Sequence, residues 1–405
     1  MGECGFFVNF TILLGMDLRF WGKIKQKKVI LMVSVFSNAQ EIAPWAIEVR
    51  RALHACPELG FEFPETKRIL SEGLNDLGIP YASVGGSLVG ELGAGDRVIL
   101  LRADCDGLPI PEETSLPFAA RNGNMHACGH DLHAAMLLGA AHVLKKREKS
   151  LPCRVRLLFQ GAEETLQGGA EAVRAGVTEG VDAAYMLHVT VGAGLPAGTV
   201  VIPPAGRIAP AADLWEITLR GGGGHGSDAT LSSPLLAGAA LALRLSELFP
   251  KGERGALTVG ALQSGSAPNV VPHEAVLRGS LRCFDDDLRR ELLENMAQAV
   301  AHLDGMEGRW RITAHCPVLQ NHPDPRSHAA ECLPRLLGAE RVVTPTVGAG
   351  GGSEDFAYVA AAVPACMMAL SAGDTPYPLH HPKVIFDEAC IPYGIAALVG
   401  LVLSD

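Results

Sequence analysis

The chain has 405 residues, a formal net charge of -10 and only 5% aromatic residues. A chain of this length divides into two or three domains, because single cores stop growing near roughly 250 to 300 residues. The acidic balance, with no basic block longer than residues 23–28, excludes nucleic acid as a partner. Ten singly scattered cysteines indicate reduced thiols in a cytoplasmic protein.

The first 41 residues carry two apolar runs, at 6–15 and 29–36, and a lysine cluster at 23–28. Each run is far shorter than the roughly 20 residues that a membrane span needs. The cluster is similar to part of a secretory signal, but it lies far from Met1 and no convincing cleavage site follows, so secretion is the lesser alternative. We expect no membrane partner, an irregular extension over residues 1–41, and a folded protein that begins near Ile42.

Helix and strand patterns alternate from residue 42 to residue 205. Helices are indicated by apolar residues at helical spacing, and strands by short apolar runs between turn residues. The expected elements are helices over 44–53, 66–77 and 134–147, a strand pair over 84–92 and 98–101, and strands over 155–159 and 183–189. This alternation predicts a largely parallel sheet.

Residues 206–316 have a different pattern. Strands expected at 214–220, 256–263, 275–284 and 310–315, with helices at 234–248 and 287–303, follow the order of a ferredoxin-like unit. The first pattern resumes over 317–405, with a strand at 365–370 and a final helix at 388–403. We therefore predict an α/β protein with a mostly parallel sheet, formed by residues 42–205 and 317–405, and an inserted ferredoxin-like α+β domain.

Residues 125–133, Met-His-Ala-Cys-Gly-His-Asp-Leu-His, concentrate metal-ligating residue types. Cys128 and His130 lie at the start of a predicted helix, and their side chains suit soft or borderline metals. Chemistry in open α/β sheets collects beyond the carboxyl ends of the strands. We therefore expect the cluster to meet the polar residues that lie at such strand ends: Asp104, Asp106, Glu163, Glu164 and His188.

The number of candidate ligands favours a site for two metal ions with a shared water. Glu163 and Glu164 leave a strand in different directions, so one binds metal while the other faces the water. The candidate ligands are Cys128, His130, Glu164, His188 and one of His380 and His381.

Each of these residues also has a simpler explanation. Glu163 and Glu164 suit an acidic helix N-terminus. Asp104 and Asp106 are alternative ligands or turn residues, although we favour a role in holding a ligand histidine in one tautomer. His225, within the glycine run 221–226, is either a hairpin residue or a mobile group that approaches a reacting carbonyl. The run lacks the Lys-Ser/Thr of a phosphate loop, and no Gly-x-Ser-x-Gly elbow supports a nucleophilic serine.

From residue 45 to the C-terminus the chain resembles the di-metal amidohydrolases. These include hippurate hydrolase, indole-acetyl-amino-acid hydrolases and N-acyl-amino-acid deacylases, within the aminoacylase and carboxypeptidase superfamily. The resemblance rests on a series of motifs in chain order: Arg50-Arg-Ala-Leu-His54 with Pro57-Glu-Leu-Gly60, Arg102-Ala-Asp-Cys-Asp106, Met125-His-Ala-Cys-Gly-His-Asp131, Phe159-Gln-Gly-Ala-Glu-Glu164, Leu187-His-Val189, Gly223-Gly-His-Gly226, Pro268-Asn-Val-Val-Pro272, Gly352-Ser-Glu-Asp-Phe356 and Leu379-His-His-Pro382.

The resemblance implies two divalent metal ions per subunit, manganese or zinc, with cobalt and nickel as further candidates. It implies Glu163 as the general base and a homodimer formed through the inserted domain, which would act as a lid. His225 would stabilise the oxyanion in the partner subunit's active site. The implied ligands are Cys128, His130, Glu164, His188 and His380, and the implied substrate-binding residues are Asn269, Arg282 and Gly352.

The predicted function is a metal-dependent amidohydrolase that splits a small-molecule N-acyl amino acid into a carboxylate and a free amino acid. The metal ions would lower the pKa of a water, and Glu163 would remove its proton. A dipeptidase or carboxypeptidase is the alternative, and a non-catalytic protein with a decayed site is less favoured. Gly161 stands where the family usually has proline, which we expect to loosen the loop. The segment after Gly226 is slightly short, which affects lid geometry and substrate preference.

Overall fold

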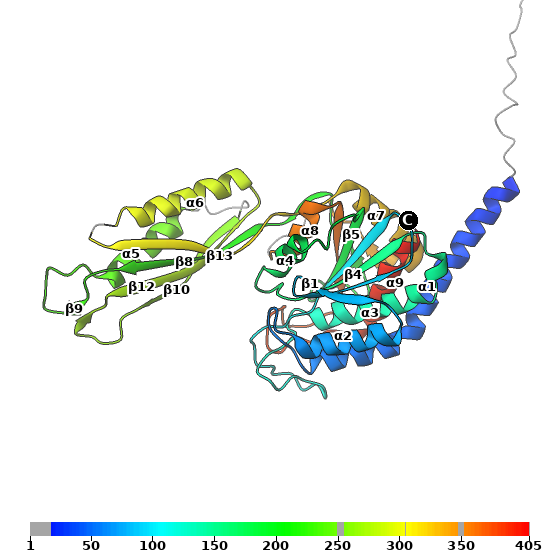
Figure 1. Cartoon of the computed structure of the whole chain (residues 1–405), viewed down its shortest axis with the longest axis horizontal. Helices are drawn as coiled ribbons and strands as arrows, with labels where there is room; N and C mark the ends of the chain where they lie inside the picture. Colours follow the sequence, from blue (N-terminus) through cyan, green and yellow to red (C-terminus); the bar gives the residue numbers. More distant parts are fainter. Residues whose placement is uncertain (1–17, 249–254, 304, 347–351, 405) are drawn as a thin grey trace, which may run out of the picture.

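The computed structural model describes residues 18–248, 255–303, 305–346 and 352–404, and it contains two units (Figure 1). One is an eight-stranded sheet with helices on both faces, and the other is a four-stranded antiparallel sheet. The second lies within the sequence of the first, which confirms the predicted fold class. The boundaries that we propose, at residues 206 and 316, lie beside a small ribbon formed by β7 (Gly206–Ala209) and β14 (Leu319–Asn321).

The centre of the large sheet is parallel. The order along it is β4 (Arg154–Gln160), β3 (Val98–Asp104), β5 (Ala183–Thr190) and β16 (Ala365–Ser371). Each of these strands pairs in parallel with its neighbour, so their carboxyl ends share one edge. The short strands β6 (Val200–Val201) and β15 (Val342–Val343) extend the sheet beyond β16.

The strand pair predicted at 84–92 and 98–101 is wrong in two respects. The first strand is broken into β1 (Tyr81–Val84) and β2 (Ser87–Leu92), because Gly85 and Gly86 have φ of 55° and 75° and form a tight hairpin turn. β2 pairs with β1 and β4, whereas β3 takes β4 and β5 as neighbours. Every residue of β3 is buried, as expected for a central parallel strand.

The irregular extension predicted for residues 1–41 is wrong from residue 18 onward. Helix α1 (Leu18–His54) runs through Pro44, which the sequence pattern had suggested as a helix start. Val35, Ala39, Ile42 and Ala46 form one buried stripe at helical spacing, and this stripe continues the contacts of the predicted helix toward the N-terminus. The apolar run at residues 6–15 lies outside the described residues.

Helices cover the large sheet unequally. With α1, four helices pack on one face: α2 (Pro64–Asp76), α3 (His130–Lys145), α7 (Pro323–Leu337) and α9 (Ile391–Leu403). The short helices α4 (Gly168–Arg174) and α8 (Phe356–Ala362) pack on the other. Single 3-10 turns are η1 (Glu148–Ser150), η2 (Ala339–Arg341) and η3 (Glu388–Cys390). Within the described ranges, no helix is both long and apolar enough to cross a bilayer.

The small unit has the predicted ferredoxin-like order. Its elements are β8 (Ala211–Arg220), α5 (Pro234–Leu248), β10 (Gly255–Ser264), β12 (Glu274–Cys283), α6 (Asp286–Ala301) and β13 (Glu307–Cys316). The sheet order is β10-β12-β8-β13, and both helices contribute to a core around Trp215. A ribbon of β9 (Gly224–His225) and β11 (Val270–Val271) projects from the end farthest from the large sheet (Figure 1).

Candidate metal centre

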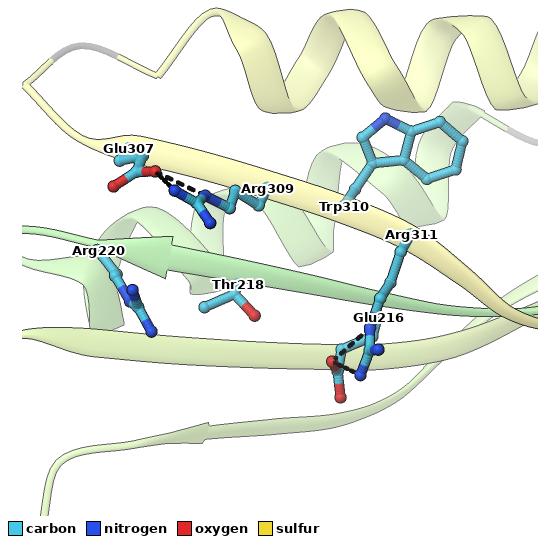
Figure 2. A pocket seen from close by; sticks show the side chains of 7 residues that line it. All are labelled: Glu216, Thr218, Arg220, Glu307, Arg309, Trp310 and Arg311. Atoms are coloured by element: carbon cyan, nitrogen blue, oxygen red, sulfur yellow. Dashed lines mark hydrogen bonds and ion pairs between the residues drawn. The ribbon is translucent and has the colours of Figure 1, made fainter.

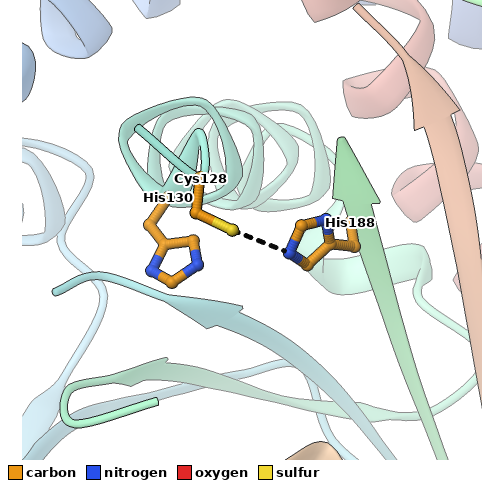
Figure 3. A group of neighbouring side chains, drawn as sticks. All are labelled: Cys128, His130 and His188. Atoms are coloured by element: carbon orange, nitrogen blue, oxygen red, sulfur yellow. Dashed lines mark hydrogen bonds between the residues drawn. The ribbon is translucent and has the colours of Figure 1, made fainter. Parts of the chain in front are cut away.

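The start of α3 and the end of β5 bring three predicted ligands together. Gly129 has φ of 83°, and a Cβ there would lie 2.3 Å from Val189 Cγ2, so only glycine allows this turn between Cys128 and His130. The Cys128 Sγ lies 3.6 Å from His188 Nε2. Figure 3 shows Cys128 and His130 at the helix end, with Cys128 facing His188 on the strand.

Main-chain carbonyls orient both histidines for ligation. His188 Nδ1 lies 2.7 Å from the Val189 carbonyl oxygen, and His130 Nδ1 lies 2.9 Å from that of Asp106. Since carbonyl oxygens only accept, each Nδ1 carries a proton, so in the neutral imidazole Nε2 is the nitrogen that has the lone pair for a metal. The role proposed for Asp106, holding a ligand histidine in one tautomer, therefore fits its main-chain oxygen.

Glu164 and His380 complete a second group of donors around Cys128. His380 Nε2 lies 3.3 Å from Cys128 Sγ and 3.6 Å from Glu164 Oε1. The His380 main-chain N–H donates to the Ala127 carbonyl, which fastens the late loop to the Cys128 segment. The neighbouring His381 instead stacks on Tyr377, with ring centroids 4.4 Å apart. The geometry thus favours His380 over His381 as the ligand.

The donor atoms fit two cations that share one thiolate. Cys128, His130 and His188 form one group with all donor atoms within 4.8 Å of one another, and Cys128, Glu164 and His380 form another. The buried atoms His130 Nε2 and Glu164 Oε1 have no hydrogen-bond partner, which is costly unless something else binds them. Thiolate, imidazole and carboxylate together suit zinc and related divalent ions.

The electrostatics of the cluster also favour bound cations. Burial, reinforced by Glu354, Asp355 and Glu164, holds the pKa of Glu163 well above its usual range. Burial raises the pKa of Glu164 to about 7 against the opposing effect of His130. Burial likewise raises the pKa of the Cys128 thiol. A divalent cation would reverse these shifts, because it stabilises the deprotonated ligands.

A strained loop presents Glu163 and Glu164. Among the residues with assigned structure, the non-glycine residues with positive φ are Ala162, Leu166 and His380, at 60°, 57° and 66°. Ala162 and Leu166 flank the two glutamates in the chain, and His380 is itself a candidate ligand. The Asp106 carboxylate accepts the Glu163 and Glu164 main-chain N–H groups at 3.0 and 3.1 Å, which holds both residues in place. Strain of this kind, held by surrounding contacts, is typical of functional sites.

Gly161 does not loosen this loop, contrary to our expectation. A Cβ at this position would lie 2.2 Å from Phe63 Cε1 and 2.7 Å from the Gly60 carbonyl oxygen. Phe63 is fully buried, so its ring has little room to move. The glycine instead permits close packing directly before the two carboxylates.

The inserted domain's predicted residues lie apart from the cluster. The β9–β11 ribbon lies at the distal end of this domain (Figure 1). His225 is exposed on β9, where its Nδ1 lies 2.8 Å from Ser227 Oγ, and the Asn269 carbonyl accepts the Gly226 main-chain N–H. Arg282 lies near the opposite end of β12, where it donates to Ser280 Oγ. Gly352 is exposed, two residues before the buried Glu354. Within one subunit, His225 and Asn269 therefore do not reach the donor cluster.

Three buried residues near Glu163 were given no role from the sequence: Arg102, Glu354 and Asp355. The sequence offered one signal for this group, which is that Arg102 is a charged residue in the otherwise apolar segment 98–103. Only the fold places it beside residues 354 and 355, which are about 250 positions away in the chain.

A hollow of about 360 Å³ lies elsewhere, on the open face of the four-stranded sheet (Figure 2). Its charged side chains form exposed ion pairs, such as Arg311 with Glu216 at 2.8 Å, and contacts of this kind are weak in water. None of its lining residues belongs to the donor cluster. The lining residues are Glu216, Thr218, Arg220, Glu307, Arg309, Trp310 and Arg311.

The fold and the cluster define a two-domain hydrolase with a candidate dinuclear centre. The chain belongs to peptidase family M20/M25/M40, whose model matches residues 100–404, and it is a hydrolase of the amidohydrolase and peptidase kind. It is 32% identical to an N-acetylcysteine deacetylase of Bacillus subtilis over 361 residues, which cover 85% of this chain and 92% of the relative. It is 29% identical to thermostable carboxypeptidase 1 of Saccharolobus solfataricus over 394 residues, which cover 91% and 97%.

Among solved structures, the chain is similar to a dinuclear metal-binding peptidase of the M20 family from Bacillus subtilis. The TM-score is 0.73 at 28% identity, and the match covers 90% of this chain and 98% of the other. The predicted family resemblance is confirmed, and the family implies a small-molecule amide substrate.

Proposed function

We propose that this protein is a metal-dependent amidohydrolase that cleaves an N-acyl amino acid into a carboxylate and a free amino acid. The observation that supports it most is the pair of donor groups that share Cys128, with Glu163 next to them in a further group with His130 and Glu164. Cys128, His130, Glu164, His188 and His380 would hold two divalent ions, zinc or manganese, with cobalt and nickel as alternatives.

Glu163 is the general base in this proposal. Bound divalent ions supply Lewis acidity, which polarises the amide carbonyl and makes a water more acidic. Glu163 accepts the proton of the attacking water and passes it to the leaving amine. Its position is set by the Asp106 carboxylate on its own N–H and by the Asp355 N–H, which lies 3.4 Å from Glu163 Oε1. Its buried setting excludes water that would compete for the same proton.

A homodimer through the inserted domain would supply the missing oxyanion donor. His225 projects at the far end of that domain, so we propose that it reaches the site of a partner subunit and hydrogen-bonds the developing oxyanion. Helix α5 supports an interface on this domain, because Leu236 and Leu243 are 70% and 69% exposed. Asn269, Arg282 and Gly352 remain proposed contacts for the substrate.

Two substrate classes follow from the relatives. The deacetylase relative acts, by its name, on an N-acetyl amino acid, which is the class that we favour. The carboxypeptidase relative makes a peptidase acting on short peptides the second candidate. We infer that the protein works in the cytoplasm, since the cysteines that the structure describes are free and most are buried.

A substrate panel with matched variants tests the proposal. Wild type, loaded in turn with zinc, manganese, cobalt or nickel, is assayed on acetyl, benzoyl, indole-acetyl and succinyl amino acids and on dipeptides. Glu163→Gln should bind metal normally but lose about 10²- to 10⁴-fold in kcat, as expected for a missing general base. Glu171→Gln, which changes a half-buried acid on α4 that pairs with Arg174, serves as the control. Near wild-type turnover by Glu163→Gln rejects the assigned base, and turnover of dipeptides alone selects the peptidase alternative.

Mixed dimers test the contribution of His225. His225→Ala and Glu163→Gln subunits are each expected to be nearly inactive alone. A mixture should regain activity, because one of its two sites then combines an intact Glu163 with an intact His225 from the other subunit. A mixture that stays inactive after subunit exchange removes the support for a shared site.

A further inference from the structure

The Arg102 guanidinium lies fully buried at the carboxyl end of β3, among side chains from three separate segments. Its Nη1 lies 2.9 Å from Asp104 Oδ2 and 3.1 Å from Glu354 Oε1. Its Nη2 lies 2.7 Å from Asp355 Oδ1, and its Nε donates to Gln160 Oε1 at 3.1 Å. All three nitrogens are therefore used, in directions that the planar fork of arginine provides and the single ammonium of lysine does not.

One arm of this cluster leads to the proposed base. Asp355 is fixed from several sides: Arg102 binds one oxygen, the Gln160 amide donates at 2.8 and 2.9 Å, and the Gly169 N–H donates at 2.7 Å. The main-chain N–H of Asp355 lies 3.4 Å from Glu163 Oε1. Holding the Asp355 side chain therefore holds the backbone donor that faces the Glu163 carboxylate.

The other arm leads to a proposed metal ligand. Asp104 binds Arg102 through Oδ2 and accepts the His133 Nδ1–H through Oδ1. His133 Nε2 in turn accepts the Val189 N–H at 2.7 Å, which fixes His133 as the neutral Nδ1–H tautomer. The Val189 carbonyl is the acceptor for His188 Nδ1. The chain of contacts thus runs from the arginine to the backbone that orients His188.

We propose that Arg102 is a positioning residue for the reaction, which holds the Asp355 donor against Glu163 and, through Asp104 and His133, the residue Val189, whose carbonyl orients His188. It touches neither substrate nor reacting atoms. Its cation offsets Asp104, Glu354 and Asp355, which would otherwise be buried carboxylates without a counter-charge. This inference rests on the proposed function, because it takes Glu163 as the base and His188 as a ligand.

The test compares Arg102→Lys and Asp355→Asn with wild type. Folding is checked by circular dichroism, metal affinity by chelator competition with zinc, and kcat and KM are measured after zinc loading. Arg102→Lys keeps the charge but loses the fork, so kcat should fall about 100-fold with KM nearly constant, the effect of a small misplacement. Its zinc affinity should fall about tenfold, as for lost support of a ligand. Asp355→Asn should lose kcat while keeping zinc affinity, because only the base arm is broken.

Two controls separate this inference from the proposed function. Arg156→Lys changes an arginine on the neighbouring strand β4, which binds Glu91 at 2.6 Å, and should leave kcat and zinc affinity unchanged. Glu163→Gln is measured in parallel, and its full activity would refute the assigned base itself. If Glu163→Gln is inactive while Arg102→Lys keeps wild-type kcat and zinc affinity, the positioning role is overturned. Should Arg102→Lys fail to fold, wild-type kcat in Asp355→Asn overturns it equally.

Discussion

Replacing Gly161 with alanine should damage both stability and catalysis. The added Cβ would lie 2.2 Å from Phe63 Cε1 and 2.7 Å from the Gly60 carbonyl oxygen, where carbon contacts normally lie about 3.5 to 4 Å apart. The chain must therefore move by about 1 Å, because the Phe63 ring is buried and covered by Lys67 Nζ at 4.3 Å. Overpacking of this kind costs about 1 to 3 kcal/mol of unfolding free energy.

The same displacement reaches Glu163, two residues along the chain. A misplacement near 1 Å lowers kcat by about 100-fold, so the loss of activity should exceed what partial unfolding explains. The assay is urea unfolding with kcat at fixed metal loading. Gly90→Ala is the matched control on β2, because its nearest neighbour would be Ile79 Cγ2 at 3.5 Å, an ordinary contact. Wild-type stability and kcat in Gly161→Ala would refute the packing argument.

Three further predictions address metal binding and assembly. His380→Ala should lose one metal ion per subunit by elemental analysis, whereas His381→Ala should keep both; equal losses would contradict the ligand choice. The metal affinity of stripped protein, measured by chelator competition, should rise about tenfold or more between pH 6 and pH 8. Burial raises the pKa of Glu164 to about 7, and ligation needs the deprotonated carboxylate. An affinity that does not change with pH would contradict this prediction. Leu243→Glu should convert the proposed dimer to a monomer in light scattering without unfolding it, since Leu243 is 69% exposed on α5; a dimeric mass in both wild type and variant would exclude that face.

Much of the fold could be predicted from sequence periodicity. The inserted domain has local patterns, alternating in strands and helical between them, and its order of elements agreed closely with prediction. The predictions failed where contacts between elements distant in the sequence determine the structure. Pro44 looked like a helix boundary, but packing of α1 against α3 and α9 carries the helix through it. The partners of β3 depend on sheet order, which local patterns do not contain.

The candidate site was predictable in its residue types and less so in its geometry. The residue types and spacing of Cys128, His130 and Glu164 identify them as candidate ligands in the sequence. They converge because the parallel strands of the large sheet end at one edge. The positive φ of Ala162 and the proximity of Arg102 to Asp355 arise only from tertiary contacts. Gly161 illustrates this limit of prediction from sequence. We expected a glycine to make the loop flexible, whereas in the structure it allows tight packing against Phe63.

The placement of Cys128 in both donor groups has a consequence for the chemical durability of the site. A single alkylation or oxidation of its sulfur would remove one donor atom from each group, so both proposed metal positions would be weakened together. Its reactive form is the thiolate, and burial raises the pKa of the thiol in the stripped protein. Stripped protein should therefore resist thiol reagents and tolerate storage in air, although this cysteine belongs to the centre that the reaction would depend on.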